Sequence, residues 1–404
     1  MSLRAITAII EDTKEMRQLL AGLRNGAYPY QVSGLSGADK AAYIAALFNK
    51  TLPRPLLLLT LGNRRAQDLA LDLEVFVDNG RVCLFPDVEV LPHEEVAAPL
   101  EIMVSRLEVL EGLARGERLL VVAPIDALMR ALPPVEAFRE RFLTIEAGAR
   151  SDLEELLAAL IDLGYERVSM VEGPGQFARR GGILDIYPPT RTEPVRCEFF
   201  GDEILSLRAF DPVTQRSMAG LEEVQVGPAR EFTAGTAEQI GDEILAIAAG
   251  QADRIAALKG EKAAQELLER VRGHVEKLRE GVKFYGKDQY LPHFYPKLAT
   301  LLDYLPEGLL VIDEPERIRE HLQVWERELG EQIASLLEKG AVLPSYNANF
   351  VSPDELAQRA KAHPQVAFTT LPRKTKGGAI TVQTRAPGAF HGKMKYLLRE
   401  VEKW

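Results

Sequence analysis

Short apolar runs alternate with amphipathic segments between residues 30 and 132. The apolar runs are "YQVSG" (30–34), "PLLLLTLG" (55–62), "RVCLFPD" (81–87) and "RLLVVAP" (118–124). The segments between them have helical periodicity and lie near 38–49, 63–78 and 99–115. Short strands that are apolar on both sides and are joined by helices are typical of a parallel sheet covered on both faces. The pattern therefore predicts an α/β domain with a parallel, P-loop-like or Rossmann-like sheet.

The pattern changes after Pro134 and becomes mostly strand-like. The segment "SDLEELLAALIDLGY" predicts one helix, which we expect to begin at a Ser151 cap and to end at Gly164. The strand-like pieces that follow are "ERVSMVE", "GGILDIYP", "PVRCEFF" and "EILSLRAFD". Gly201 and Asp202 join the last two pieces as a two-residue hairpin turn. One helix against antiparallel strands predicts a small α+β domain inserted at about 142–227.

The remaining chain is mostly helical. We expect one long helix across about 236–280, and the apolar run "GLLVIDEP" (308–315) predicts a strand that returns to the first sheet. The later stretch "LPRKTKGGAITVQTRAPGAFHGKM" has the Lys, Gly and Pro content of a linker, and "KYLLREVEKW" predicts a short helix at the end. We therefore expect a first part of the P-loop-like domain (1–141), the insert (142–227), a returning part of the first domain (228–345), and a linker with the start of a following domain (346–404).

Composition narrows the class of protein but not its function. The chain has 404 residues, of which 46% are hydrophobic and 27% charged, as in an ordinary globular protein. Its net charge of −10 gives no overall basic excess for nucleic acid. Two distant cysteines, no signal-like start and no run of 18 apolar residues favour a cytoplasmic protein without a membrane segment. The six histidines show no metal-ligand spacing, and we nominate no catalytic residue and no metal site.

The stretch "QVSGLSGADKAAYIAALF" (31–48) resembles a phosphate-binding loop followed by a helix. The working pattern is GxxxxGK[ST]; here Gly34 and Lys40 are in register, but Asp39 replaces the second glycine and Ala41 replaces the hydroxyl residue. Ala41 removes a ligand for Mg²⁺, and Asp39 places a carboxylate beside the anion site, where it could also neutralise Lys40.

An acidic pair, Asp313 and Glu314, ends the predicted strand at 308–315. Such a pair occurs in nucleotide sites, where it holds Mg²⁺ and orients water, but it also occurs wherever acids precede a helix. We interpret one set of residues as a vestigial nucleotide site: Gly34, Gly37, Asp39, Lys40, Ala41, Asp313 and Glu314. An ordinary strand, turn and helix, with Gly34 and Gly37 serving the turn, explains the loop equally well.

Arginines are concentrated in the insert of this acidic protein. Residues 172–217 contain Arg179, Arg180, Arg191, Arg196, Arg208 and Arg216. Alternation in "PVRCEFF" places Arg196 and Phe200 on one face of a strand, with Val195 and Cys197 on the other. An exposed Phe beside arginines is typical of a protein-binding hot spot. The alternative is that Phe200 packs under the hairpin while the arginines are solvated or paired with Glu198 and Asp185.

The segments "GPGQFARRGGILDIYPPT" and "PVRCEFFGDEILSLRAFDPVTQRS" closely resemble the amino-terminal module of bacterial transcription-repair coupling factors. That module is itself similar to UvrB, the damage-recognition helicase of the excinuclease that performs nucleotide excision repair, and we take the similarity to extend from about residue 15 to the end. The resemblance implies a degenerate helicase-type, P-loop-like domain interrupted by a small domain that binds UvrA, another component of the excinuclease. It assigns the contact with UvrA to Arg180, Arg196 and Phe200.

The resemblance also implies a division of labour along a longer protein. No cofactor is expected in this chain, whereas ATP and Mg²⁺ would serve a translocase motor, and RNA polymerase and DNA would bind, in a carboxy-terminal part that these residues lack. The chain would then be a non-catalytic recruitment module that brings excision repair to stalled RNA polymerase. Two alternatives stay open: a nucleotide-dependent helicase or ATPase acting through Lys40 and Asp313, and direct DNA binding by the arginines of the insert.

Overall fold

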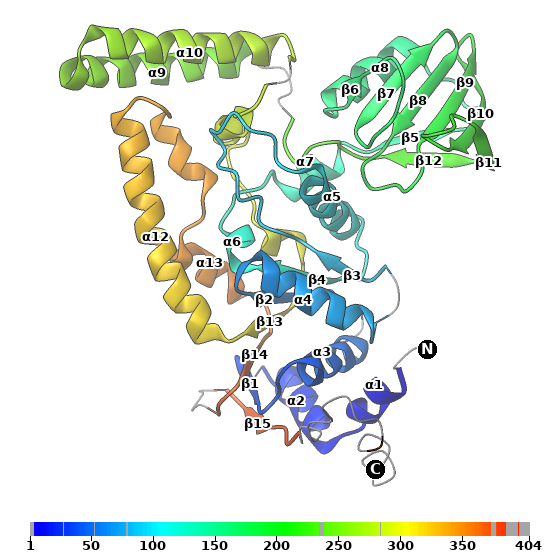
Figure 1. Cartoon of the computed structure of the whole chain (residues 1–404), viewed down its shortest axis with the longest axis vertical. Helices are drawn as coiled ribbons and strands as arrows, with labels where there is room; N and C mark the ends of the chain where they lie inside the picture. Colours follow the sequence, from blue (N-terminus) through cyan, green and yellow to red (C-terminus); the bar gives the residue numbers. More distant parts are fainter. Residues whose placement is uncertain are drawn as a thin grey trace.

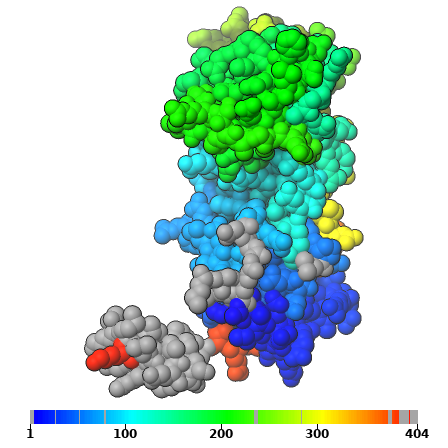
Figure 2. All heavy atoms as spheres, turned by 90° about the vertical axis from the view of Figure 1, so that its right-hand side faces the viewer, coloured from blue at the N-terminus to red at the C-terminus, as the bar shows by residue number. Residues whose placement is uncertain are grey.

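Three bodies make up the computed structural model, which describes residues 4–26, 28–51, 53–77, 80–233, 238–282, 284–372, 377–384 and 395. The largest is a sheet covered by helices, and a smaller domain and a pair of long helices lie at one end of it (Figure 1). Seen from the side, the smaller domain lies above the sheet domain, so the described part of the chain is elongated (Figure 2).

The main sheet is parallel throughout. Its described strands have the order β15-β1-β14-β13-β2-β4-β3, and every neighbouring pair runs parallel. They are β1 (Tyr30–Ser33), β2 (Leu56–Thr60), β3 (Val82–Leu84), β4 (Leu120–Pro124), β13 (Leu309–Asp313), β14 (Gln365–Thr369) and β15 (Ala379–Thr381). Leu58 of β2 faces one apolar cluster, while Leu57 and Leu59 face another on the opposite side. Because both faces are buried, the apolar runs are continuous, and the prediction of a parallel α/β sheet is confirmed.

Helices cover both faces of this sheet. One face packs against α1 (Arg4–Glu11), α2 (Lys14–Arg24), α3 (Ala38–Lys50) and α4 (Gly62–Glu74). The other packs against α5 (Leu100–Ala114), α6 (Ile125–Leu128), α7 (Val135–Arg139), α12 (Pro315–Glu338) and α13 (Pro353–Ala360). The three helices expected between the first strands are therefore present, and each connects two strands of the sheet.

The boundary expected at residue 345 is wrong. β14 lies between β1 and β13, and β15 lies beside β1 at the edge of the sheet, so the first domain continues at least to Thr381. The Lys, Gly and Pro content around the three-residue strand β15 concealed it, and β14 lay in a stretch to which we assigned no element. The short helix expected at 395–404 lies outside the described residues, apart from Lys395.

The insert is a small α+β domain. Its sheet has the order β11-β10-β9-β8-β7-β6, antiparallel except for the pair β6 and β7, and a two-stranded ladder joins β5 to β12. The elements are β5 (Leu143–Glu146), α8 (Leu153–Asp162), β6 (Glu166–Arg167), β7 (Gln176–Arg180), β8 (Ile183–Tyr187), β9 (Val195–Phe200), β10 (Glu203–Phe210), β11 (Ser217–Leu221) and β12 (Glu223–Val226). Phe200 pairs with Glu203 across the predicted turn. The cap of α8 is Asp152 rather than Ser151, because the Asp152 carboxylate accepts from the free amides of Glu154 and Glu155.

The long helix expected at 236–280 is two helices. α9 (Glu238–Lys259) and α10 (Glu261–Arg279) pack against each other as a hairpin, with Ile244 and Ile255 of α9 and Leu267 of α10 buried in one apolar cluster. Gly260 separates them with φ 90°, a conformation that ends a helix and that glycine adopts without steric penalty. Helical periodicity continues on both sides of Gly260, so periodicity alone did not reveal the break.

Short helical elements connect the hairpin to β13: η1 (Lys287–Tyr290), α11 (Leu291–Phe294) and η2 (Leu301–Tyr304). A further one, η3 (Pro344–Asn349), connects α12 to α13. Across the part of the chain that the structure describes, no helix combines the length and the apolar character needed to cross a bilayer.

Candidate functional site

The loop between β1 and α3 keeps the backbone of a phosphate loop. Gly34 has φ 88°, and a Cβ at this position would lie 2.3 Å from the carbonyl oxygen of Val382, in the segment after β15. Gly37 caps α3 with φ 56° and supplies no side-chain hydrogen bond. Gly34 is therefore required by the close approach of another strand, and Gly37 by the sharp entry into the helix.

Lys40 is buried and ion-paired. Its Nζ lies 2.5 Å from Asp313 Oδ1 and 3.7 Å from Glu314 Oε1, and Lys40 is only 3% exposed. Arg65 donates to the other oxygen of Asp313 at 3.3 Å. The structure thus brings Lys40, Asp313 and Glu314 together. Lys40 is neutralised by Asp313 and not by Asp39, which lies on the exposed side of the first turn of α3.

Glu314 is held in a conformation that is unusual for a residue with a side chain. Its φ is 56°, in the left-handed region, and it precedes Pro315 at the start of α12. Its Oε1 accepts from the backbone amide of Thr370 at 2.8 Å and from the Thr370 hydroxyl at 2.6 Å. Glu314 therefore ties the end of β13 to the residue after β14.

A cavity of about 370 Å³ opens beside this ion pair, lined by Gly37, Lys40, Arg65, Asp313 and Arg317 among others. The residues present do not fit a magnesium-bound nucleotide. Phosphate could reach the Lys40 ammonium only by separating a buried ion pair, which costs several kcal/mol. Ala41, where a metal-binding hydroxyl would stand, is fully buried and carries no side-chain oxygen. No catalytic step through a nucleotide can be derived from this geometry.

Two arginines of the insert converge on one buried carboxylate. Arg196 donates from Nε to Asp185 Oδ1 at 2.7 Å and from Nη2 to Oδ2 at 2.9 Å. Arg180 donates to the same Oδ2 at 2.8 Å. Asp185 has no exposed surface, and hydrogen bonding to it raises the pKa of Arg196. The two guanidiniums are thereby held side by side on one face of the sheet.

Further contacts fix Arg196 more firmly than Arg180. Arg196 also donates to the carbonyl of Gln215 at 3.1 Å, and its guanidinium lies 4.6 Å from the centre of the Phe210 ring. Its side chain is 13% exposed, whereas that of Arg180 is 47% exposed. Arg180 can therefore offer charge to a partner, while Arg196 mainly shapes the surface around it.

Phe200 is exposed at the end of β9. It is 76% exposed, whereas Val195 and Cys197 of the same strand are fully buried beneath the sheet. The predicted alternation along β9 is confirmed, and Phe200 does not pack under the hairpin. The alternative that the arginines are paired with an acid does hold for Arg180 and Arg196, since Asp185 neutralises part of their charge.

Strand register adds one residue that the resemblance did not assign to the contact with UvrA. Arg208 of β10 stands directly opposite Arg196 of β9 and is exposed. Side chains in register on neighbouring strands share a face. Alternation counted from the Gly201-Asp202 turn does not place Arg208 on the same face as Arg196, because the register of β9 and β10 shifts by one residue between Ile204 and Ser206.

Comparison with known proteins agrees with this architecture. Residues 143–232 match the family described as the UvrB interaction domain. The chain is 33% identical to a transcription-repair-coupling factor of Bacillus subtilis over 404 residues, which cover 99% of the chain and 34% of that protein. It is 30% identical to the transcription-repair-coupling factor of Myxococcus xanthus, over 91% of the chain and 31% of that protein. The chain thus spans about a third of the length of these curated relatives. The resemblance to transcription-repair coupling factors, first seen in the motifs of the insert, is confirmed over nearly the whole chain.

Proposed function

We propose that this chain is the recruiting part of a transcription-repair coupling factor and that its 142–227 domain binds UvrA of the nucleotide-excision-repair nuclease. One observation carries the proposal: Phe200 is exposed on the same strand, β9, as Arg196, which shares the Asp185 carboxylate with Arg180, in a domain that matches the UvrB interaction domain. The bound nuclease would be brought to stalled RNA polymerase. Polymerase and DNA binding, and an ATP-dependent translocase that removes the polymerase, belong to the rest of such a protein.

The geometry suits a protein partner. An aromatic side chain that is already exposed at a strand end can bury apolar area on contact with a partner. The guanidinium of Arg180 is held in place by Asp185 before the partner arrives, so fewer rotamers are lost on binding. Arg180 and Phe200 would make direct contacts, and Arg196 would position them.

The chain's part in this function is non-catalytic. The Lys40–Asp313 ion pair and the buried Ala41 oppose binding of a magnesium-bound nucleotide at the only loop with phosphate-binding character that we found in the sequence. The backbone of that loop would act as scaffold, since Gly34 supports the contact with the segment after β15.

The test is calorimetry with purified UvrA. Phe200→Ala removes a hot-spot aromatic, and we expect the dissociation constant to rise by about 30-fold or more, corresponding to about 2 kcal/mol. The matched control is Leu71→Ala, which truncates another exposed apolar side chain (63% exposed) on α4 of the sheet domain. Unchanged thermal unfolding of both variants shows that folding is intact. Wild-type affinity in Phe200→Ala would overturn the proposal.

A further inference from the structure

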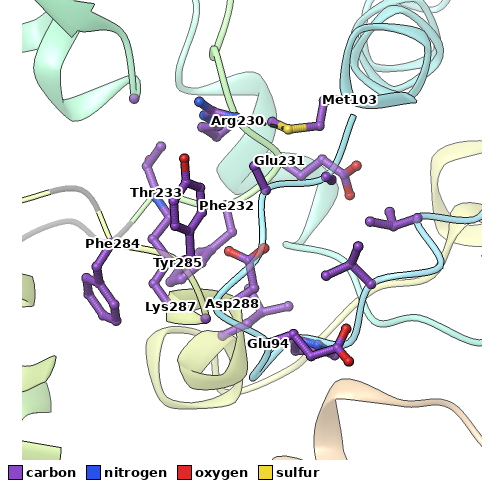
Figure 3. Close-up of a pocket in the computed structure, with 18 of the residues that line it drawn as sticks. Glu94, Met103, Arg230, Glu231, Phe232, Thr233, Phe284, Tyr285, Lys287 and Asp288 are labelled. Atoms are coloured by element: carbon purple, nitrogen blue, oxygen red, sulfur yellow. Dashed lines mark hydrogen bonds between the residues drawn. The ribbon is translucent and has the colours of Figure 1, made fainter. Parts of the chain in front are cut away.

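A second, larger cavity lies where the three bodies meet. Its volume is about 560 Å³, within the range of small-molecule sites. Its walls come from the loop before α5, from the end of α8 in the insert, from the connection at 230–233, and from the end of α10 with the residues after it (Figure 3). Nothing in the proposed contact with UvrA uses this cavity, because Phe200 and Arg180 are not among its lining residues.

Two charged groups in the wall are satisfied by neighbours. Arg106 forms a two-point ion pair with Glu231, donates to the carbonyl of Pro86 at 2.8 Å, and lies over the Phe85 ring. Such a pair neutralises both partners and leaves neither free for a ligand. Arg106 is 1% exposed, so this pair is part of the structure that supports the cavity.

Two other charged groups lack a counter-charge. The guanidinium of Arg230 donates to the thioether sulfur of Met103 at 2.9 Å, and a thioether is a weak acceptor. No described residue forms an ion pair or hydrogen bond with the Asp288 carboxylate. Desolvation by the surrounding protein raises the pKa of Asp288, with Lys287, Arg130 and Arg230 opposing that shift from a distance. Asp288 is exposed to the cavity and Arg230 is half-buried, so a ligand in the cavity can reach both charged groups and supply the missing partners.

Beside these two groups the cavity offers aromatic and apolar surface. Figure 3 shows Phe232 and Tyr285 in the wall between Arg230 and Asp288, Met103 next to Arg230, and the Asp288 carboxylate directed into the cavity. The Tyr285 side chain is 49% exposed. The Phe232 ring is fixed edge-on against Phe294, with ring centres 5.0 Å apart. A ligand that carries two opposite charges and an apolar or aromatic side chain matches this arrangement.

The charge of the whole wall limits the ligand further. Six Lys and Arg side chains and five Asp and Glu side chains line the cavity, a net charge of +1. A multiply charged phosphate ester would lack sufficient counter-charge here, whereas a molecule with one positive and one negative group would not.

We propose that this cavity binds a small zwitterion with an apolar or aromatic body, of the class of free amino acids and dipeptides. Its carboxylate pairs with Arg230, its ammonium with Asp288, and its side chain lies against Phe232 and Tyr285. Since all three bodies contribute to the wall, the ligand stabilises the arrangement of the insert and the helical hairpin around the sheet domain.

The test uses a panel of the common amino acids and of dipeptides that contain Phe, Tyr, Trp or Met. Binding is followed by ligand-observed NMR and by thermal unfolding. We expect saturable binding by at least one member, with a rise in the unfolding temperature. Asp288→Asn keeps the shape of the side chain and Arg230→Gln keeps a shorter polar side chain; each removes a charge, and we expect each to weaken binding by about tenfold or more. Asp39→Asn, which removes an exposed acid far from the cavity in sequence and outside its wall, is the matched control and should bind as wild type.

Several outcomes overturn the proposal. These are the absence of binding by any member of the panel, binding that neither variant weakens, and preferential binding of nucleoside monophosphates included as a second panel. If Arg230→Gln unfolds, Asp288→Asn still decides the matter. Asp288 is exposed, so its replacement by Asn should leave the ligand-free protein about as stable as wild type, and weaker binding in that variant reports on the site itself.

Discussion

Asp185 accepts a two-point hydrogen bond from Arg196, through both carboxylate oxygens, at the centre of the exposed sheet of the insert. The carboxylate has no exposed surface and also binds Arg180. A single buried acid thus sets the positions of both arginines that the proposed contact uses. Asp185 does not reach the surface, so its effect on a partner would be exerted through the arginines.

We expect Asp185→Asn to lower the free energy of unfolding by about 3 kcal/mol, because it leaves the buried side of Arg196 without its counter-charge. Binding to UvrA should weaken as well, although Phe200 remains exposed. Urea unfolding measures the first effect and calorimetry the second. The control is Glu198→Gln on β9, where the half-buried acid accepts from Ser206 at 2.8 Å and a smaller loss, of about 1 kcal/mol, is expected. Equal losses in the two variants would contradict the special role of Asp185.

Strands β14 and β15 predict how far the chain must extend for the sheet domain to fold. A chain that ends at residue 345 lacks β14, which lies between β1 and β13, and β15, which covers the outer edge of β1. Without β14 the hydrogen-bonding edges of two buried strands are unpaired, so we expect no cooperative unfolding transition. A chain that ends at residue 384 keeps both strands and should unfold cooperatively. Circular dichroism during heating distinguishes the two; a sharp transition in the shorter chain would show that β14 is dispensable.

How far the sequence predicts this fold depends on the length and the apolar content of each strand. The first strands are continuous apolar runs of Leu and Val, so their existence and their parallel, buried setting could be inferred directly. β15 is a three-residue strand in a stretch rich in Lys, Gly and Pro, and its place is set by long-range pairing with β1. Local composition carries no information about such a contact.

In the candidate site, too, local pattern predicts some features and long-range contacts determine the others. Alternation along β9 predicts that Arg196 and Phe200 share a face, and this is what the strand shows. The convergence of Arg180 and Arg196 on Asp185 depends on the register of three strands, which the sequence alone does not supply. Likewise, the Lys40–Asp313 pair joins the first turn of α3 to the end of β13, far away in the sequence, so the acid beside Lys40 in the chain was the wrong partner to suggest.

The nucleotide loop supports a prediction about stability and about ligand binding. Lys40→Met leaves Asp313 buried, with only Arg65 at 3.3 Å, and we expect the free energy of unfolding to fall by about 3 kcal/mol. Adding Asp313→Asn should restore part of this loss, because no uncompensated charge then remains. Urea unfolding of the single and double variants provides the measurement. Calorimetry of the wild type should detect no tight binding of Mg-ATP; tight binding that Lys40→Ala abolishes would instead support a working nucleotide site.

The stability of the contact between α10 and the residues that follow it should depend on pH through His274. This residue of α10 stacks on Phe284 with ring centres 4.9 Å apart, and its Nδ1 lies 2.9 Å from the Tyr290 hydroxyl. Burial, with help from Arg270 and Lys277, lowers the pKa of His274 from 6.5 to about 4; Glu95 opposes the shift. The folded protein therefore keeps His274 neutral at pH values where the unfolded chain already protonates it.

Between pH 6.5 and about 4, the unfolded state binds one more proton at this position than the folded state does, so stability must fall as the pH is lowered through this window. The full effect is on the order of 3 kcal/mol. His274→Gln keeps a polar group near the Tyr290 hydroxyl but cannot be protonated. Urea unfolding of both proteins across this range should show a shallower loss of stability in the variant, because groups common to both proteins cancel in the comparison. Parallel pH dependence in the two proteins would mean that His274 is protonated as easily in the folded state as in the unfolded one, and that the contact of α10 with Tyr290 does not exclude the charged form.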